Sequence, residues 1–420
     1  ERMGWTGDAQ MFSGTACFNM DCGAFFGKFL YDLALEQRNL GGKVPDFVPT
    51  FGMKQNGSAA WSDAATVIPW NLYLHYGDKA VLERQLESMI AYVEHIKSLD
   101  DGDRLWDSGF HYGDWLALDG KGEFSREGGT PTDLIATAYY AYSAGLVAKA
   151  ARVLGKEDLA QEYEQLAEEV KKAFCDEFVT PRGRMAVNTQ TAHILPLFMD
   201  LVPDELRPRI IASLVELLKE NNYYLKTGFV GTPYLCRVLS ENGHNDIAYK
   251  LLLNEEFPSW LYAVKLGATT IWERWNSLLP DGRFGELGMN SLNHYCYGSI
   301  VEWMYRHMCG INPLEAAPGF RRFKLAPQPS QRLEYAKASL DSAAGRIESG
   351  WQYMERGIRY SFAVPFNTEA ELELEAPLLL GVTINSRPLE ESWVQYTYRS
   401  GKLIAYLPAG RYEIFCPQED

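Results

Sequence analysis

The stretch that decides the predicted fold class is residues 132–178, TDLIATAYYAYSAGLVAKAARVLGKEDLAQEYEQLAEEVKKAFCDEF. Apolar residues recur at helical spacing on both sides of Gly155, which predicts one helix over 133–154 and a second over 157–178. Thr132 is suited to cap the first helix, and Gly155 is suited to end it. The stretch is therefore predicted to be a pair of helices joined by a short turn.

The same pattern continues over about 310 residues with almost no strand signal. Further helices are predicted over 21–39, 61–76, 78–99, 185–200, 204–221, 230–241, 245–254 and 291–309. In the first of these, Asp21 is suited to cap the helix, and Phe25, Phe29 and Leu33 recur at helical spacing. Paired helices on this scale form either a solenoid or a closed ring, and no repeat motif is visible, which favours a ring. Periodicity predicts the pairs but does not show that they close.

Two long loops interrupt the predicted helices. Residues 43–58 contain two prolines and two glycines. Residues 100–130 are polar and rich in glycine, and they include Gly113-Asp114-Trp115. A loop of that length in a compact domain is often functional, so Asp114 and Trp115 are candidate site residues.

The hydrophobic period changes from 3.6 to 2 after the stretch GINPLEAAP, residues 310–318. Strands are predicted over 358–364, 370–375, 403–407 and 412–415, with turns at Asn385-Ser386 and Pro408-Ala409-Gly410. We therefore predict a small all-β domain over 313–420, most simply an antiparallel sandwich, after a helical domain over 1–312. No catalytic constellation is visible in the β-domain, which we interpret as structural or weakly sugar-binding.

The composition narrows the function classes. A formal net charge of −15 disfavours nucleic acid, anionic membranes and polyanionic substrates as partners, whereas neutral sugars fit. Seven scattered cysteines without a CxxC pair indicate neither a zinc site nor a disulfide framework. No phosphate-binding glycine loop, GxSxG or HExxH motif occurs, so we expect neither a cofactor nor a metal. No stretch is apolar enough to cross a bilayer.

The N-terminal stretch ERMGWTGDAQMFSGTACFNMD, residues 1–21, sets Glu1 and Asp8 on either side of Trp5. A flat aromatic ring can stack on the apolar face of a sugar, and carboxylates bond sugar hydroxyls or move protons. The same cluster is also compatible with an N-terminal turn whose Trp fills the core.

A second candidate carboxylate, Glu273, lies in TTIWERWN, residues 269–276, between two tryptophans. Burial among rings raises the pKa of a carboxyl group, and the adjacent Arg274 is expected to lower it, which suits a base that stays ionised. Glycoside hydrolysis needs two carboxyl groups, and Glu1 and Glu273 are the two that stand out. The alternative for Glu273 is a surface Glu–Arg pair at a helix end.

These motifs together resemble the signature of the bacterial α-L-rhamnosidases, glycoside hydrolase family 78. The resemblance rests on ERMGWTGDAQ at residues 1–10 followed by FNMD at 18–21, TTIWERW at 269–275, and NHYCYG at 293–298. Three matches in the family's order are more specific than any one of them. The resemblance implies an (α/α)6 barrel of twelve helices around a pocket, followed by the β-domain.

The family correspondence implies an inverting, exo-acting enzyme that releases terminal α-L-rhamnose, with Glu1 as general acid and Glu273 as general base. Asp8 is the alternative acid, although by resemblance it binds sugar hydroxyls. The other residues that the resemblance assigns to sugar binding are Trp5, Trp61, Asp114, Trp115 and His294. The partner implied is a rhamnose-containing glycoside or polysaccharide, with its aglycone left open.

Two expectations and two alternatives remain open. Family members have further β-rich domains upstream, so we expect the chain to be a fragment. We expect a cytoplasmic or periplasmic location, of which the cytoplasm fits reduced cysteines best. The first alternative function is another helical-barrel glycosidase, or a polysaccharide lyase that would use Tyr, His and several Arg on a uronate. The second is a non-catalytic carbohydrate-binding protein.

Overall fold

The structure, a computed structural model, describes residues 3–52, 57–120, 122 and 126–418. The chain divides into two compact units. The first unit comprises Glu1–Gly14, Cys22–Trp70 and Lys79–Ile300, and the second comprises Thr15–Asp21, Asn71–Asp78 and Val301–Asp420. Short segments from the ends of two helices thus join the strand-rich unit, which periodicity along the chain could not indicate. The domain boundary after residue 312 stays a prediction.

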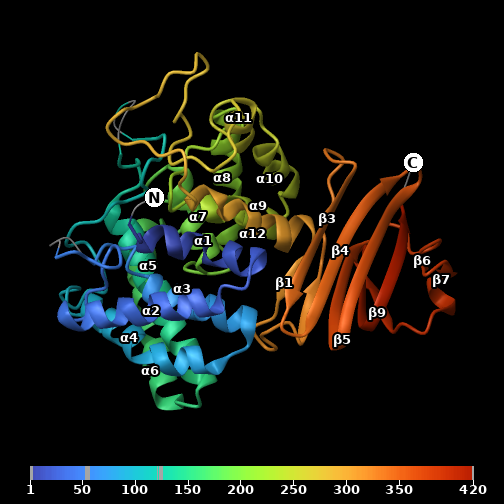
Figure 1. The fold of residues 1–420 in the computed structure, drawn as a ribbon, viewed down its shortest axis with the longest axis horizontal. Coiled ribbons are helices and arrows are strands. Elements are labelled where there is room, and N and C mark those ends of the chain that lie inside the picture. The colour runs from blue at the N-terminus through green and yellow to red at the C-terminus, as the bar shows by residue number, and fades with distance from the viewer. Residues whose placement is uncertain (1–2, 53–56, 121, 123–125, 419–420) are drawn as a thin grey trace. The chain divides into compact units, whose positions relative to one another are not determined.

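Helices account for almost all regular structure before residue 309 (Figure 1). The α-helices in the described residues are α1 (Thr6–Asn19), α2 (Gly23–Asn39), α3 (Ala64–Tyr76), α4 (Lys79–Lys97), α5 (Thr132–Val153), α6 (Glu157–Phe178), α7 (Gln190–Phe198), α8 (Arg207–Glu220), α9 (Thr232–Glu241), α10 (Asn245–Leu252), α11 (Trp260–Lys265) and α12 (Ile300–Trp303). Helix α12 lies between a 3-10 turn, Cys296–Ser299, and a π-helical turn, Met304–Met308. The periodicity did not predict α1 and α11.

The difference between α5 and α6 explains how the hairpins are arranged. Helix α5 buries apolar residues around most of its circumference, from Leu134 to Ala151, as an inner helix must. Helix α6 buries only one stripe, which includes Tyr163, Leu166 and Val170, as expected for an outer helix with a solvated face. The first turn of α5 begins at Thr132 itself, with Pro131 in the capping position.

Helix α2 differs in detail from its sequence prediction. Cys22, not Asp21, occupies its N-cap, and the Cys22 side chain makes no capping hydrogen bond. Of the three apolar positions at helical spacing, Leu33 is buried, Phe29 is half-buried and Phe25 is 67% exposed. Phe26 and Leu30 are buried instead, so the buried stripe differs from the predicted one by one residue in the first two turns.

Every second helix along the chain contacts the next one in the same series, as the inner helices of a barrel do. The ring of Trp61, just before α3, packs against Gly7 of α1, where an added Cβ would lie 2.6 Å from the indole. Thr66 of α3 lies 2.7 Å from Ser143 of α5, between the two hydroxyl oxygens. Helix α5 packs against α7, and α7 against α9.

The ring closes through the last inner helix. Phe198 of α7 stacks on Tyr234 of α9, with 3.8 Å between ring centroids, and α9 packs against the turn Cys296–Ser299. Gly298 of that turn lies against Phe12 of α1, because a Cβ there would be 3.0 Å from its ring. The helical barrel expected from the family resemblance is confirmed.

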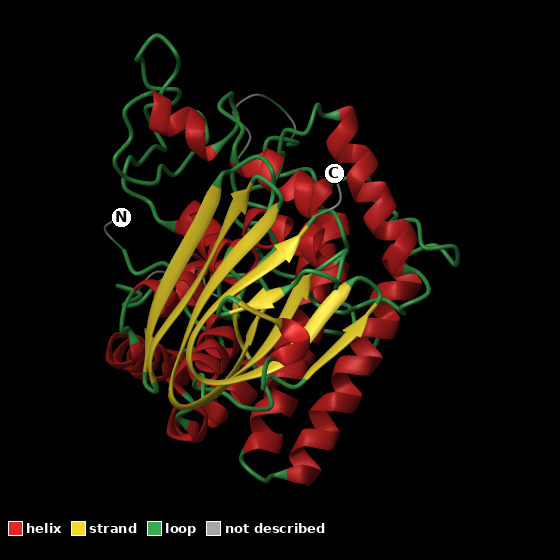
Figure 2. Ribbon diagram, turned by 90° about the vertical axis from the view of Figure 1, so that its right-hand side faces the viewer, coloured by secondary structure: helices red, strands yellow, loops and turns green. Residues whose placement is uncertain are grey.

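The second unit contains the all-β domain that the change of period predicts (Figure 2). Its strands are β1 (Ile311–Pro313), β2 (Arg322–Leu325), β3 (Tyr335–Ser342), β4 (Gly345–Met354), β5 (Gly357–Glu375), β6 (Thr383–Ile384), β7 (Arg387–Pro388), β8 (Tyr396–Arg399) and β9 (Lys402–Pro417). They form one nine-stranded sheet among the described residues. β4 pairs with the first part of β5, and β2 pairs in parallel with its second part, beyond an irregularity at Val364/Glu369.

Two turn predictions in this domain had different outcomes. Asn385 and Ser386 form the turn between β6 and β7, both with positive φ, as the sequence predicts. The predicted turn at Pro408–Gly410 is wrong, because β9 continues through it. Pro408 pairs with Glu369 beside the irregularity in β5, a place where a strand tolerates a residue without an N–H donor.

In the part of the chain that the structure describes, no helix has the length and apolarity needed to cross a membrane.

Asp63 joins α3 to the inner helix α5 and gives a pH-dependent prediction. Its carboxylate is fully buried and accepts hydrogen bonds from the Ser143 hydroxyl at 2.5 Å and the Ala60 N–H at 2.8 Å. Burial raises the pKa of Asp63 from 3.8 to about 7. Between these values the native state holds a proton that the unfolded chain has lost, so the contribution of Asp63 to stability falls as pH rises from about 4 to 7.

We therefore expect Asp63→Asn to gain stability relative to the wild type as pH rises, by a few kcal/mol at pH 8 compared with pH 4. The Ser143 hydroxyl can accept a hydrogen bond from the new amide group. Denaturant unfolding of both proteins at several pH values measures the difference. A constant difference between the two proteins across this range would contradict the prediction.

Candidate functional site

One cavity of about 470 Å³ in the helical unit combines aromatic rings with buried polar groups. Its lining comes from the start of α1, the turn before α3, the loop 100–130, and the segments around 229 and 273–294. The lining residues are Met3, Trp5, Asp8, Trp61, Tyr112, Trp115, Phe229, Glu273, Gly288, Met289, Asn290, Ser291 and His294. A cavity of this size lies in the range of about 300–1,000 Å³ that is typical of small-ligand sites.

A second hollow, of about 610 Å³, lies on the β-domain between β3, β4, β5 and β9. Three of its charged groups pair with one another: Arg411 lies 2.8 Å and Arg346 3.3 Å from carboxylate oxygens of Glu348. Its aromatic residues, Phe362 and Tyr412, are buried and offer no exposed ring for a sugar. The helical cavity is therefore the candidate site.

The three tryptophans predicted from the sequence, Trp5, Trp61 and Trp115, all line the cavity. Gly7 explains part of this arrangement: any side chain at that position would overlap the indole of Trp61, because a Cβ would lie 2.6–2.7 Å from three of its atoms. Gly7 therefore lets Trp61 pack on helix α1, which begins one residue after Trp5. The structure places these three rings around one cavity, which their spacing in the sequence alone could not predict.

Tyr112 is a wall residue that the sequence analysis missed. Its ring contacts all three tryptophans, at centroid distances of 6.0 Å to Trp5, 4.6 Å to Trp61 and 5.6 Å to Trp115. Two of these contacts are edge-to-face, the geometry that aromatic pairs favour. The only signal in the sequence is its position three residues before Trp115, within the polar loop 100–130.

Glu273 enters the cavity from a short paired segment, not from a helix. Its N–H donates to the carbonyl oxygen of Ser291 at 2.9 Å, and the N–H of His294 donates to that of Ile271 at 2.9 Å. These two hydrogen bonds hold residues 271–273 beside residues 291–294, on either side of the loop that connects them. As a result Glu273 and His294 reach one cavity, and each is at most 5% exposed.

Arg274 forms an ion pair with a carboxylate other than Glu273, and its expected effect on Glu273 stays a prediction. The guanidinium of Arg274 pairs with Glu286, 2.5 Å from a carboxylate oxygen, and its Nε–H donates to the carbonyl oxygen of Met289. Arg126 approaches the other oxygen of Glu286 at 3.6 Å. Arg274 therefore orders the loop that carries the lining residues 288–291, a role that adjacency in the sequence does not reveal.

Asp8 and His294, both predicted to bind sugar hydroxyls, form a buried pair. Nε2 of His294 lies 2.5 Å from Oδ1 of Asp8, and the two residues are 4% and 2% exposed. The ring of Phe229, another lining residue that the sequence analysis missed, lies 5.3 Å from the imidazole. The carboxylate and the aromatic ring together fix the orientation of His294 at the cavity surface.

Asp114 has a different environment from the one expected of a sugar ligand. Its buried carboxylate accepts hydrogen bonds from the Thr191 hydroxyl and from three backbone N–H groups, those of residues 228, 230 and 231. It is not among the lining residues of the cavity. Burial raises the pKa of Asp114 to about 6. The structure thus places Asp114 behind the wall, where it ties the loop before Trp115 to the start of α9.

Glu1 lies outside the described residues, so the structure gives it no position. Met3, two residues later, lines the cavity, and Trp5 follows it. Of the other predicted site residues, the structure brings six to the cavity and leaves Asp114 behind its wall. The six are Trp5, Asp8, Trp61, Trp115, Glu273 and His294.

Comparisons with known proteins agree with this architecture. The profile of the bacterial alpha-L-rhamnosidase six-hairpin glycosidase domain matches residues 1–308, and that of the bacterial alpha-L-rhamnosidase C-terminal domain matches residues 310–378. The chain is 42% identical over 376 residues to an alpha-L-rhamnosidase from Streptomyces avermitilis and 40% identical over 375 residues to one from Formosa agariphila. These alignments cover 90% and 89% of this chain.

A crystal structure of Streptomyces avermitilis alpha-L-rhamnosidase complexed with L-rhamnose matches 99% of this chain and 38% of its own, at a TM-score of 0.90 and 38% identity. The chain spans 35% of the length of the Streptomyces relative and 40% of the Formosa relative. Its helical barrel, its β-domain and the sequence matches across both show that the chain belongs to the bacterial α-L-rhamnosidase family.

Proposed function

We propose that the cavity hydrolyses terminal α-L-rhamnosides with inversion at the anomeric carbon. The observation that carries the proposal is the convergence of Glu273, the Asp8–His294 pair and three tryptophans on one cavity. A relative that shares the fold at a TM-score of 0.90 was crystallised with L-rhamnose, which supports the choice of sugar. Terminal rhamnose of a glycoside or a polysaccharide would serve as substrate.

Glu273 is the proposed general base. In an inverting glycosidase a carboxylate takes a proton from water as that water attacks the anomeric carbon, and a second carboxyl group protonates the leaving oxygen on the opposite side. Glu1 is the proposed acid. Its support comes from the family motif and from Met3, two residues later, which lines the cavity.

The remaining residues suit a 6-deoxy sugar. Trp5, Trp61 and Trp115 offer apolar faces for the ring and the C5 methyl group, which would gain nothing in a polar site. His294, held by Asp8, can donate to a hydroxyl or accept from it. The acidic balance of the chain favours such a neutral substrate. Of the two locations that we propose, cytoplasmic or periplasmic, the free cysteines fit the reducing cytoplasm better.

A panel of aryl glycosides tests the proposal. Release of the aryl group from the α-L-rhamnopyranoside is expected to exceed release from the α-L-fucopyranoside and the α-D-mannopyranoside by at least about a hundredfold in kcat/KM. A site built to bond particular hydroxyls discriminates strongly against sugars that leave its buried polar groups unpaired. Equal or faster cleavage of either rival sugar would contradict the proposal. Generation of an unsaturated, ultraviolet-absorbing product from a uronate polymer would indicate the lyase alternative.

A further inference from the structure

Glu286 lies outside the cavity lining, yet its backbone is tied to a residue that lines the cavity. The side-chain amide of Asn290, a lining residue, donates to the carbonyl oxygen of Glu286 at 3.1 Å and to that of Ser277 at 2.9 Å. The N–H of Gly285, just before Glu286, donates to the same carbonyl oxygen of Ser277 at 3.1 Å. The backbone at Glu286 therefore keeps a fixed position relative to this part of the wall.

The carboxylate of Glu286 forms ion pairs with two arginines. Its Oε2 lies 2.5 Å from a terminal nitrogen of Arg274, whose Nε–H donates to the carbonyl oxygen of Met289 at 2.9 Å. Its Oε1 lies 3.6 Å from a terminal nitrogen of Arg126. The side chain of Arg274 is 6% exposed and that of Arg126 is 47% exposed, so the first pair is buried and the second lies at the surface. The carboxylate holds the two guanidinium groups near each other, because without it their like charges repel.

The pair with Arg126 connects Glu286 to the loop that carries Trp115. The carbonyl oxygen of Arg126 accepts from the N–H of Leu116 at 2.7 Å, and Leu116 directly follows Trp115. Trp115 lines the cavity, as do residues 288–291. The Glu286 bridge, formed by Arg126, Glu286 and Arg274, therefore joins two parts of the cavity wall that lie far apart in the sequence.

We propose that Glu286 is a positioning residue that, through Arg126 and Arg274, fixes residues 288–291 relative to Trp115. The inference deepens the proposed function and rests on it, since the ligand of this wall is taken to be L-rhamnose. A wall that is fixed before the sugar arrives binds it more tightly, because less conformational freedom is lost on binding. The proposed base is held by a backbone hydrogen bond in which the Glu286 side chain takes no part, so the effect belongs to binding more than to proton transfer.

The variants Glu286→Gln and Arg126→Gln, together with the double variant, test this role. Gln keeps the size of Glu286 but carries no charge, and its NH2 group faces a guanidinium group that offers only N–H donors. Since removal of one partner from a buried ion pair is costly, Glu286→Gln is expected to raise KM for an aryl α-L-rhamnoside and Kd for L-rhamnose about tenfold. An exposed pair is worth less, so Arg126→Gln is expected to raise both constants about threefold. The change in kcat is expected to stay below about threefold in each variant.

The double variant shows whether Arg126 acts through Glu286. If it does, the double variant binds L-rhamnose about tenfold more weakly than the wild type, as Glu286→Gln alone does, whereas independent sites would give about thirtyfold. The larger loss would overturn the inference, and so would Kd values within about twofold of wild type in both single variants. A variant that only loses folded protein would show a lower apparent kcat with unchanged KM, and that result would also overturn the inference.

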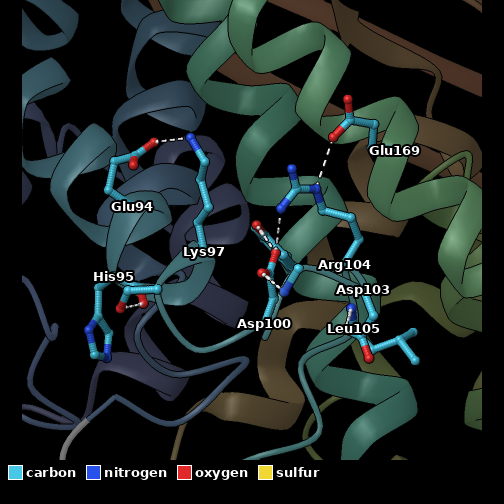
Figure 3. Close-up of polar contacts among 11 residues, drawn as sticks. Glu94, His95, Lys97, Asp100, Asp103, Arg104, Leu105 and Glu169 are labelled. Atoms are coloured by element: carbon cyan, nitrogen blue, oxygen red, sulfur yellow. Dashed lines mark hydrogen bonds and ion pairs between the residues drawn. The ribbon is translucent and has the colours of Figure 1, made fainter.

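Arg104→Gln is the matched control, because Arg104 lies in the same loop 100–130 as Arg126 and also pairs with carboxylates. Figure 3 shows this separate cluster, in which Arg104 lies 3.0 Å from Oδ2 of Asp100 and 2.9 Å from Oε2 of Glu169. Arg104 is not among the lining residues of the cavity. Arg104→Gln is expected to lower Tm at least as much as Arg126→Gln, because its ion pairs are closer, while leaving KM and Kd unchanged. A rise in KM equal to that of Arg126→Gln would overturn the inference.

Hydrogen exchange distinguishes failure of the inference from failure of the proposed function. The N–H groups of Gly285 and Leu116 are hydrogen-bonded to carbonyl oxygens on the two sides of the Glu286 bridge. Exchange of the peptides that contain them, measured by mass spectrometry, is expected to be at least about fivefold faster in Glu286→Gln than in the wild type, and unchanged in Arg104→Gln. Unchanged exchange in Glu286→Gln would overturn the inference even if the wild type cleaves rhamnosides. Faster exchange in Glu286→Gln, together with a wild type that neither binds nor cleaves rhamnosides, would support the bridging role and contradict the proposed function instead.

Discussion

Glu273→Gln is expected to lower kcat for an aryl α-L-rhamnoside by about a thousandfold or more, with little change in KM. The amide keeps the size and shape of the side chain but cannot accept a proton from water, and a positioned general base contributes roughly 10²–10⁴-fold. The side chain is buried at the cavity wall, and its backbone N–H is bonded to Ser291, so the fold should be retained. Steady-state kinetics at neutral pH measure the effect.

Two comparisons sharpen this prediction. Glu169→Gln makes the same chemical change at an exposed ion pair with Arg104, outside the cavity, and should leave kcat within twofold of wild type. Glu273→Ala opens space beside the anomeric carbon, so added azide should restore turnover. Azide then takes the place of water and gives the β-L-rhamnosyl azide as the aryl oxide leaves. Wild-type turnover in Glu273→Gln would remove Glu273 from the mechanism.

Asp114→Ala is expected to destabilise the helical unit by at least about 3 kcal/mol. The substitution leaves the backbone N–H groups of 228, 230 and 231 buried without their acceptor, and each unsatisfied group costs about 1–3 kcal/mol. The backbone approach is close: a Cβ at Gly228 would lie 2.1 Å from the carbonyl oxygen of Trp115, which leaves no room to rearrange. Denaturant unfolding of the chain measures the loss.

Asp114→Asn should be intermediate, because its amide oxygen can still accept from part of this set while its NH2 group faces other donors. The order wild type, Asn, Ala in decreasing stability is the expected outcome. Residual activity in the folded fraction should persist, since Asp114 does not line the cavity. An Ala variant as stable as the wild type, with rhamnose affinity lost, would return Asp114 to the role of sugar ligand that the sequence suggested.

The helices were the most predictable part of the fold. The hydrophobic period is a local property, and it placed α6 at Glu157–Phe178 as the structure has it. Helix ends that depend on neighbours were less predictable, as the N-cap at Cys22 shows. The strand β9 passes through Pro408–Gly410 because it pairs with β5 beside an irregularity, and no local pattern in the sequence announces that pairing.

The site residues that lie in family motifs could be predicted from the sequence. The surroundings of residues whose partners lie elsewhere along the chain could not. Asp8, Glu273 and His294 were found through their motifs. The surroundings of Asp114 could not be predicted, because the four groups that donate to its carboxylate belong to residues that lie far along the chain. The ion pair of Arg274 with Glu286 was equally hard to predict, because the two residues are not neighbours in the sequence.

Tyr112 escaped the sequence analysis for a related reason. A single Tyr in a polar loop carries no motif. Its significance appears only when the fold places three tryptophans around its ring.

The stereochemistry of the released sugar tests the central claim most directly. The chain would be incubated with an aryl α-L-rhamnopyranoside, and the anomeric proton of the first-formed rhamnose would be followed by NMR before mutarotation. Initial appearance of β-L-rhamnose is the predicted result, because water activated by Glu273 attacks from the face opposite the leaving group. Initial appearance of α-L-rhamnose would mean retention and would contradict the assignment of Glu273 as a general base.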